Sequence, residues 1–116
     1  MASHALPPDR RIRRRAEFQR VFDAGRRAHG RYLTIIAVSA TRSETRLGIV
    51  ASRKLGGAVI RNRAKRLIRE VFRIHKAPPM ACDLVIIPKQ GLLRAKVQEI
   101  GHDYEATLKR LGLSKQ

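Results

Sequence analysis

A run of cationic side chains between positions 53 and 73 is the chemically densest part of the sequence. Within it, basic residues recur at helical spacing, which places them on one arc of a helix next to an apolar stripe. Most are arginines, whose planar guanidinium can bind phosphate through two parallel hydrogen bonds and can stack on nucleobases. The pattern therefore predicts a surface that binds a polyanion. The polar members of this arc are Arg61, Asn62, Lys65, Arg66, Arg69 and Arg73, and Arg63 flanks the stripe on its other edge.

The sequence contains few groups that are suited to catalysis. The nine acidic residues are scattered, and the sequence has no paired-carboxylate motif, Walker-type phosphate loop, nucleophile elbow or dinucleotide fingerprint. His102 and Asp103 are neighbours on a predicted helix, where successive side chains point about 100° apart. Cys82 is the single cysteine, and the four histidines match no zinc spacing, so we expect neither an internal disulfide nor a structural metal. We therefore expect a protein that acts by binding.

The overall charge supports the same conclusion. Twenty-six Lys or Arg stand against nine Asp or Glu, which gives a formal net charge of +17 and a pI near 11.7. The cations concentrate over 42–76, with eleven basic residues against two acidic ones. No apolar run approaches the roughly 20 residues that a bilayer crossing needs, and no secretory signal follows the charged start. We expect a cytoplasmic protein that meets polyanions and no membrane.

Aromatic side chains beside arginines favour RNA as the polyanion. Phe18 and Phe22 lie one helical turn apart in an arginine-rich segment, and Tyr32 follows Arg31. Single-stranded RNA is commonly held by stacking of its bases on aromatic rings within a positively charged groove. The spacing of Phe18 and Phe22 is more typical of core packing than of a base platform, and both alternatives stay open. The apolar stripe over 58–75 is needed to cover strands, which disfavours binding to lipid.

The elements that must position these groups follow from periodicity and from breaker residues. They predict one small α+β domain, a two-layer sandwich in the order helix, strand, strand, helix, strand, helix. Polar residues over 41–44 predict a hairpin turn between the first two strands, and two adjacent glycines predict a flexible basic loop over 53–57. The helices are expected over 13–24, over 58–75 and from 97 to an end at 112, and the strands over 32–38, 46–52 and 83–88. Residues 1–11 and 113–116 are expected to be tails around a domain over 12–112.

The stretch from Leu47 to Glu70, LGIVASRKLGGAVIRNRAKRLIRE, resembles the signature of the protein subunit of bacterial ribonuclease P. Its Arg-Asn-Arg core followed by x-Lys-Arg-Leu-Ile-Arg is highly specific. EFxxVFxxG over 17–25 and DLVIIP over 83–88 also match in order and spacing, so the likeness covers nearly the whole chain. Gly57 stands where the family usually has asparagine, and the first helix carries Arg-Arg-Ala where a polar cap often lies.

The resemblance implies a binding subunit of an endonuclease that removes the 5′ leader from precursor tRNA, with catalysis by divalent ions such as Mg²⁺ held mainly by an RNA subunit. It implies no cofactor on the protein itself and one protein for each catalytic RNA. It also implies a left-handed β-α-β crossover over 46–88, which general handedness rules would not predict. The residues expected to contact the catalytic RNA are Arg53, Lys54, Arg61, Asn62, Arg63, Lys65, Arg66 and Arg69. Those expected to line a cleft for the leader are Phe18, Phe22, Tyr32, Thr34 and Ile36.

Two other functions are compatible with parts of the sequence. A ribosomal or RNA-assembly protein could share the small basic α+β fold without any linked cleavage, and composition does not separate it from a ribonuclease P subunit. A stand-alone nuclease would need a carboxylate cluster near the cationic helix face, and Glu70 by itself does not form one. The register of the Arg-Asn-Arg helix favours the ribonuclease P subunit.

Overall fold

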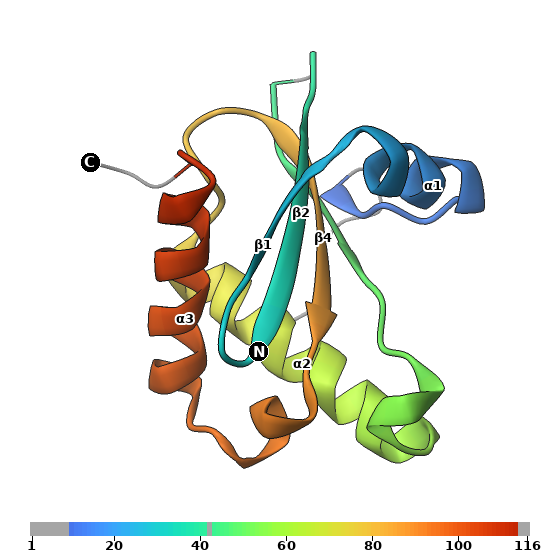
Figure 1. Ribbon diagram of the computed structural model, residues 1–116, viewed down its shortest axis with the longest axis vertical. Coiled ribbons are helices and arrows are strands. Elements are labelled where there is room, and N and C mark those ends of the chain that lie inside the picture. The colour runs from blue at the N-terminus through green and yellow to red at the C-terminus, as the bar shows by residue number, and fades with distance from the viewer. Residues whose placement is uncertain (1–9, 42, 114–116) are drawn as a thin grey trace, which may run out of the picture.

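The computed structural model of the protein describes residues 10–41 and 43–113. They form a four-stranded sheet, ordered β1-β2-β4-β3, with three α-helices packed on it (Figure 1). The elements are α1 at Arg15–Ala24, β1 at Arg26–His29, β2 at Leu33–Ser39, β3 at Arg46–Ile49, α2 at Ala58–His75, β4 at Cys82–Pro88 and α3 at Val97–Arg110, with short 3-10 helices η2 at Arg53–Leu55 and η3 at Gln90–Arg94.

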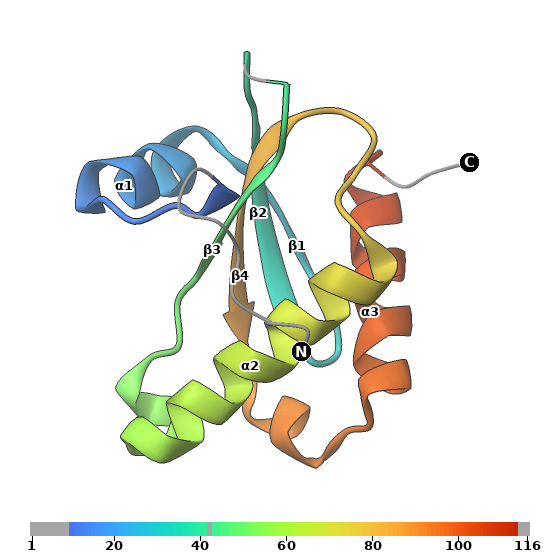
Figure 2. The ribbon, with the colours of Figure 1, turned by 180° about the vertical axis from the view of Figure 1, so that it is seen from behind.

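Strand β4 lies inside the sheet and has a partner on each side. It pairs antiparallel with β2 along its whole length and parallel with β3. Because β3 and β4 run the same way, the chain must return between them, and α2 makes that return. Figure 2, seen from the side on which α2 lies, shows both strands running downward with β4 to the right of β3, so the crossover is left-handed. Such crossovers are rare, and this one agrees with the expectation from the family resemblance.

The sheet separates two apolar clusters of unequal size. The larger cluster joins β2, β3 and β4 to α2 and α3, and Tyr104 is its largest fully buried side chain. The smaller cluster lies on the opposite face and contains Val21 of α1, Ile36 and Val85. Strand side chains alternate between faces, so Ile35 belongs to the larger cluster while its neighbour Ile36 belongs to the smaller one. Helices α2 and α3 form a layer against one face of the sheet, and α1 lies near one end of the other face (Figure 1).

Helix α2 spans the range that its sequence pattern predicts. Ala64, Ile68, Val71 and Phe72 are buried in the larger cluster, so most of the apolar stripe is core. Ile60, which the pattern also places in the stripe, is 42% exposed. The first turn of α2 extends past the strands, as Figure 1 shows, and this explains the exposure.

The predicted hairpin between the strands over 32–38 and 46–52 is wrong. β2 and β3 are not neighbours, because β4 lies between them. The antiparallel hairpin partner of β2 is β1, a strand of four residues that sequence reasoning missed because it is short, basic and largely exposed. Helix α1 begins at Arg15 instead of position 13, β3 ends at Ile49, and part of the expected flexible loop forms η2. The remaining boundaries differ from prediction by one or two residues.

The segment that precedes α1 is part of the fold, although we expected its first residues to be a tail. Arg11 forms a parallel bridge with Leu47, and the side chain of Ile12 is buried. These contacts cover part of the outer edge of β3, which would otherwise expose unpaired backbone groups. Leu113, also expected in a tail, packs against the larger cluster. The other expected tail residues, 1–9 and 114–116, lie outside the described residues.

The turn between β1 and β2 is anchored by α3. Asp103 accepts hydrogen bonds from the backbone N–H groups of Arg31 and Tyr32, both at 2.8 Å. A turn leaves N–H donors outside the strand ladder, and a carboxylate makes charge-assisted bonds to them. The side chain of Lys89 adds a bond from Nζ to the carbonyl oxygen of Gly30. Asp103 therefore caps the hairpin turn.

Replacing Asp103 with Ala should destabilise the free protein by about 2 kcal/mol, because two charge-assisted hydrogen bonds are lost and two turn donors lose their acceptor. Urea unfolding at neutral pH, followed by circular dichroism, measures the change. Asp23→Ala is the matched control, since it removes one acid from the same cationic chain at an exposed position that bonds to Gln19. Equal stability of the two variants would contradict the anchoring role.

Candidate nucleic-acid interface

The outer surface of α2, together with η2, forms the most cationic part of the molecule. Its buried stripe fixes the rotation of α2, so the opposite arc must face solvent. All eight polar residues predicted to bind catalytic RNA lie here, five of them exposed and three half-buried. We define the cationic face as Arg53 and Lys54 of η2 with Arg61, Asn62, Arg63, Lys65, Arg66 and Arg69 of α2.

The charge of the cationic face is not neutralised by neighbouring acids. Among the described residues, none of its seven cations takes part in an ion pair. Arg73, further along α2, differs, because Glu70 accepts two hydrogen bonds from it at 2.7 and 3.2 Å. These bonds raise the pKa of Arg73. Guanidinium and ammonium groups without protein partners are free to replace the counterions of a phosphate backbone.

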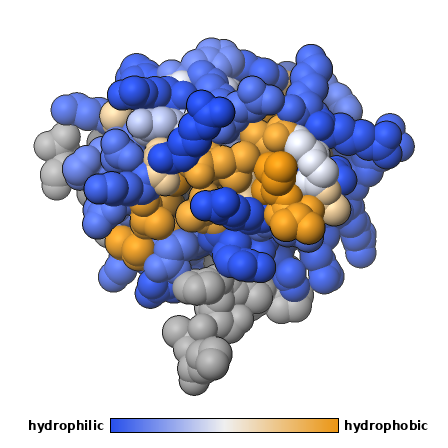
Figure 3. Space-filling view, turned by 90° about the horizontal axis from the view of Figure 1, so that it is seen from below, coloured by the Kyte–Doolittle hydropathy of each residue, from blue (hydrophilic) through white to orange (hydrophobic). Residues whose placement is uncertain are grey.

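Exposed apolar side chains lie next to these charges where α2 begins. Val59 is 83% exposed, and it stands with the partly exposed Ile60 directly before Arg61. A view of this end of the molecule shows hydrophilic side chains around an apolar area (Figure 3). Cations that hold a backbone and apolar groups that contact bases are a combination suited to RNA with unpaired nucleotides.

Four of the five residues in the second predicted group lie on the face of the sheet that carries α1, which we call the α1 face. Phe18 and Phe22 are half-buried and pack against the smaller apolar cluster. A Cβ atom on Gly48 would lie 2.6 Å from Cε1 of Phe18, so the ring rests on the glycine backbone of β3. Each phenylalanine is partly core and partly surface, so core packing holds in part for both rings, and their role as a base platform stays a prediction.

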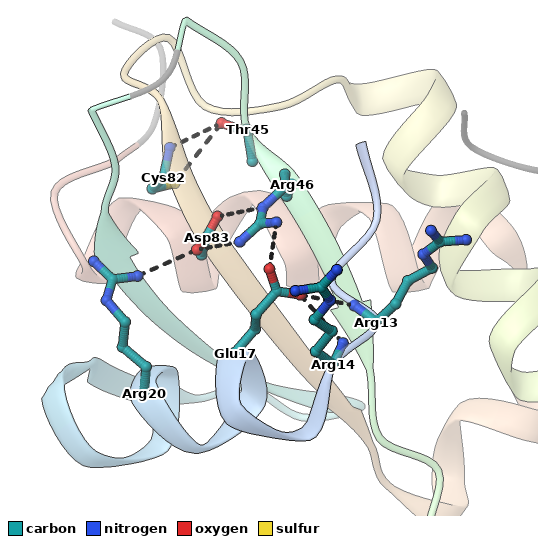
Figure 4. Close-up of polar contacts among 8 residues, drawn as sticks. All are labelled: Arg13, Arg14, Glu17, Arg20, Thr45, Arg46, Cys82 and Asp83. Carbon is teal, nitrogen blue, oxygen red and sulfur yellow. Dashed lines mark hydrogen bonds and ion pairs between the residues drawn. The ribbon is translucent and has the colours of Figure 1, made fainter. Parts of the chain in front are cut away.

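Four charged residues hold α1 above the sheet (Figure 4). Arg46 of β3 donates to the two oxygens of Asp83 at 3.2 and 3.1 Å and to Glu17 of α1 at 2.8 Å. Arg20, one turn beyond Glu17, donates to Asp83 at 3.3 Å. The side chain of Asp83 is 1% exposed, and a buried carboxylate is tolerated only when such partners compensate the loss of water.

Glu17 joins this network to the start of α1. Its carboxylate accepts hydrogen bonds from the backbone N–H groups of Arg13 and Arg14 at 3.3 and 3.2 Å, and so substitutes for the polar cap that the sequence lacks. The hydrogen bond from Arg46, followed by that from the Arg14 backbone, lowers the pKa of Glu17 from 4.5 to about 2. Hydrogen bonding, first to Asp83 and then to Glu17, raises the pKa of Arg46.

The structure separates Tyr32 from the other residues predicted to line a leader cleft. Tyr32 precedes β2, so strand alternation does not extend to it, and it packs against the larger cluster with Arg31 5.2 Å from its ring centroid. Ile36 is on the α1 face but is completely buried, so it supports α1 and does not reach the surface. Thr34 is 6% exposed on the same face, and its hydroxyl lies 3.0 Å from Nδ1 of His29.

Strand β1 adds two side chains to the α1 face that sequence reasoning missed. Arg27 pairs with Ile36 and His29 pairs with Thr34, and directly paired residues point to the same side of a sheet. Both β1 side chains are exposed. A strand of four residues carries too little alternation to be found in the sequence, and the face that its residues share depends on the register with β2.

Two other kinds of site are lacking in the part of the chain that the structure describes. No three His, Cys, Asp or Glu side chains come together there in a way that could hold a metal ion. No helix there is long and apolar enough to cross a membrane. Cys82 is buried, and its thiol lies 3.9 Å from the hydroxyl of Thr45.

Known proteins are similar to this chain in sequence and in fold. The sequence model of the family described as Ribonuclease P matches residues 6–112. The ribonuclease P protein component of Staphylococcus haemolyticus is 37% identical over 99 residues, which cover 85% of this chain and 87% of that protein. The ribonuclease P protein component of Geotalea uraniireducens is 33% identical over 111 residues, which cover 96% of this chain and 98% of that protein. Among solved structures, the Staphylococcus aureus RNase P protein superimposes with a TM-score of 0.80 at 34% identity, covering 91% of this chain and 98% of that one. The RNase P protein of Thermotoga maritima superimposes with a TM-score of 0.77 at 33% identity, and the match covers 86% of this chain and 96% of that one.

Substituting Glu17 with Gln should remove about 1–2 kcal/mol of stability at neutral pH, where the side chain's 29% exposure weakens the ion pair. The folded pKa of Glu17, about 2, lies below the ordinary 4.5, so its contribution is complete above pH 4.5 and is lost as the pH falls toward 2. Urea unfolding at several pH values should therefore show wild type and variant converging in acid. Parallel stability curves for the two proteins would contradict this role.

Proposed function

The chain belongs to the Ribonuclease P protein family, and from this premise we propose how its two surfaces divide the work of the enzyme. It is the protein subunit of ribonuclease P, the endoribonuclease that removes the 5′ leader of precursor tRNA. Its partners are therefore the ribonuclease P RNA and the tRNA precursor. Membership in this family sets aside the alternative of a ribosomal or assembly protein without linked cleavage.

The cationic face is the surface that we assign to the catalytic RNA. The observation that supports this assignment is the gathering of seven cations on one side of α2 and η2 with no ion pair among the described residues. Arginine forks can engage phosphates in pairs of hydrogen bonds, while the exposed Val59 can contact a base or sugar. Because α2 is fixed to the sheet by its buried stripe, the face is preformed and loses little conformational freedom on binding.

The α1 face is the surface that we assign to the single-stranded leader. Phe18 and Phe22 supply partly exposed rings, and Arg27 and His29 supply polar groups at the edge of the same face. Aromatic rings beside cations hold single strands with little sequence preference, which suits leaders of many sequences. Thr34 and Ile36 support this surface from below, since both are buried.

We further propose that the divalent ions of the holoenzyme are held by RNA phosphates, because the described residues offer no cluster of protein ligands. The chain's own contribution is to bind and orient the two RNAs. One protein for each catalytic RNA is the simplest arrangement, because a single cationic face serves a single binding region. The cytoplasm, where transcripts are processed in bacteria, is the compartment that follows from the substrate.

Reconstitution tests the proposed function directly. Purified protein is mixed with a bacterial ribonuclease P RNA and a 5′-labelled precursor tRNA at low magnesium concentration. We expect the protein to stimulate cleavage at the mature 5′ end, and we expect protein without the RNA to cut nothing. Cleavage by protein alone, or no effect of protein on the RNA-catalysed reaction, would refute the proposal.

Replacing Arg66 with Ala should weaken binding of the protein to the catalytic RNA by about 1–3 kcal/mol, because Arg66 is exposed at the centre of the cationic face and a charge-assisted phosphate contact is lost. The slope of log affinity against log salt concentration should also fall by about one. The control is Arg26→Ala, which removes an exposed arginine from β1 at the opposite sheet edge. Identical affinity and slope for both variants would exclude Arg66 from the interface.

Replacing Phe18 with Ala should abolish the preference of the holoenzyme for precursor tRNA with a leader of several nucleotides over one with almost none, because stacking contributes about 1–3 kcal/mol per base. Loss of the half-buried ring should lower the free energy of unfolding by about 1–2 kcal/mol, less than the roughly 3–5 kcal/mol that removal of a fully buried phenylalanine costs. Val97→Ala is the control, because it trims a half-buried side chain of α3 that packs on the other face of the sheet. If Phe18→Ala keeps the full leader preference, the ring serves only packing.

A further inference from the structure

A pocket of about 340 Å³ opens at the outer edge of β3, between the segment that precedes α1 and helix α2. Among the described residues, four cations line it and no acidic residue does. Arg11 and Arg13 come from the N-terminal segment, while Lys65 and Arg69 come from the middle of α2. Figure 4 shows Arg13 extended away from the network around Asp83, on the side where α2 lies. Two cationic segments far apart in the sequence therefore face one space.

Two of these cations have buried donors with no partner. The Nε atoms of Arg11 and Arg69 are inaccessible to solvent, and neither has a hydrogen-bond partner among the described residues. Leaving a buried donor unsatisfied costs free energy, and charged groups cost more than neutral ones. Arg11 itself is fixed by its backbone bridge to Leu47, so its place beside α2 is set by the fold.

The electrostatic setting of Arg69 is unfavourable in the free protein. Desolvation is the first cause that lowers its pKa, and repulsion from Arg11 and then from Arg66 adds to it. Like charges are thus held together in a partly desolvated place, and none of the described acidic residues forms an ion pair with Arg11 or Arg69 there. An anion that entered the pocket would be attracted by every cation that lines it.

The position of the pocket relates it to both surfaces already described. Lys65 and Arg69 belong to the cationic face, whereas Phe18 and Gly48, which also line the pocket, belong to the α1 face. The edge of β3 is therefore the place where the two surfaces meet. An RNA strand that passes from one surface to the other would bring its backbone past this point.

From these contacts we infer that the pocket binds a backbone phosphate of RNA, gripped between Arg11 of the N-terminal segment and Arg69 of α2. The inference rests on the proposed function and adds to it a site that bridges the two surfaces. The phosphate belongs either to the catalytic RNA or to the leader of precursor tRNA, because both are phosphodiesters with the same chemistry. The N-terminal segment, which the sequence does not mark as a binding element, then becomes one half of the site.

The test uses Arg11→Gln, Arg69→Gln and the double variant, with Arg26→Gln as the matched control for loss of one arginine. Thermal melting of the free proteins is measured first. Removing either pocket arginine should leave the melting temperature unchanged or raise it, because a repulsive pair is relieved. A structural role for these side chains predicts the opposite, and a large fall in melting temperature would overturn the inference. Arg11→Lys and Arg69→Lys, which keep the charge but lose the planar fork, provide folded variants in any case.

Binding measurements then distinguish the source of the phosphate. In the first measurement, the affinity of the protein for a bacterial ribonuclease P RNA is determined at a series of salt concentrations. In the second, the affinity of the assembled holoenzyme is determined for precursor tRNA with a long leader and with a very short one. We expect a loss of roughly tenfold for each single variant and a salt slope reduced by about one. If the phosphate belongs to the catalytic RNA, the loss appears in the first measurement. If it belongs to the leader, the loss appears only with the long-leader substrate.

The double variant and the wild type complete the test. Because both arginines grip one phosphate, the double variant should lose less than the product of the two single losses. Pocket variants that match Arg26→Gln in both binding measurements would overturn the inference while leaving the proposed function intact. A wild-type protein that fails to bind the RNA would instead refute the proposed function itself.

Discussion

The carboxylate of Asp83 constrains where α1 can lie, and the surface that we propose for the leader depends on that position. Asp83 is on β4, nearly without solvent access, and its charge is compensated by Arg46 of the neighbouring strand and Arg20 of α1. Arg46 in turn binds Glu17, which caps the start of α1. Breaking such a pair leaves an unmatched buried charge, which costs more than the pair itself contributes. A helix that makes few apolar contacts with the sheet is thereby held in one orientation.

This arrangement explains how α1 can present aromatic rings without being absorbed into the core. Only Val21 of α1 is fully buried, and Phe18 and Phe22 are half-buried. A helix with such limited burial would be weakly docked by the hydrophobic effect alone, since burial energy scales with apolar area removed from water. The polar network supplies the orientation that apolar contact does not, and the rings remain accessible beside the sheet.

Charged side chains around α1 are paired with one another, whereas on the other side of the molecule most cations of α2 have no ion-pair partner among the described residues. A net charge of +17 on 116 residues is self-repulsive. Among the described residues, the ion pair of Arg73 with Glu70 and the hydrogen bond between His75 and Glu105 both lie toward the end of α2. The first three turns of α2 keep their cations unpaired among the described residues. The large apolar cluster beneath α2 holds these like charges together, and in the function that we propose RNA phosphates supply the counter-charge that the described residues do not.

The sequence by itself determined the elements whose signals are local. The alternation of apolar and basic residues over 58–75 predicted both the limits of α2 and its cationic arc, because helix periodicity is a property of consecutive residues. The motif around Arg61, Asn62 and Arg63 led to the family, which the comparisons confirmed. Fold class followed from the order of these elements, and the left-handed crossover followed from the resemblance.

Only the tertiary structure decided which segments became neighbours. The pairing of β2 with β1 and β4 instead of β3 arises from contacts distant in sequence, and a short basic strand such as β1 has no local signal of its own. Tyr32 lies apart from Thr34 and Ile36, with which the strand pattern grouped it, because β2 begins only at Leu33 and Asp103 holds the turn before it. The approach of Arg11 to Arg69 depends on a bridge to β3 that joins residues far apart in the chain. Periodicity fixes which side of an element is apolar, but packing and register fix what that side meets.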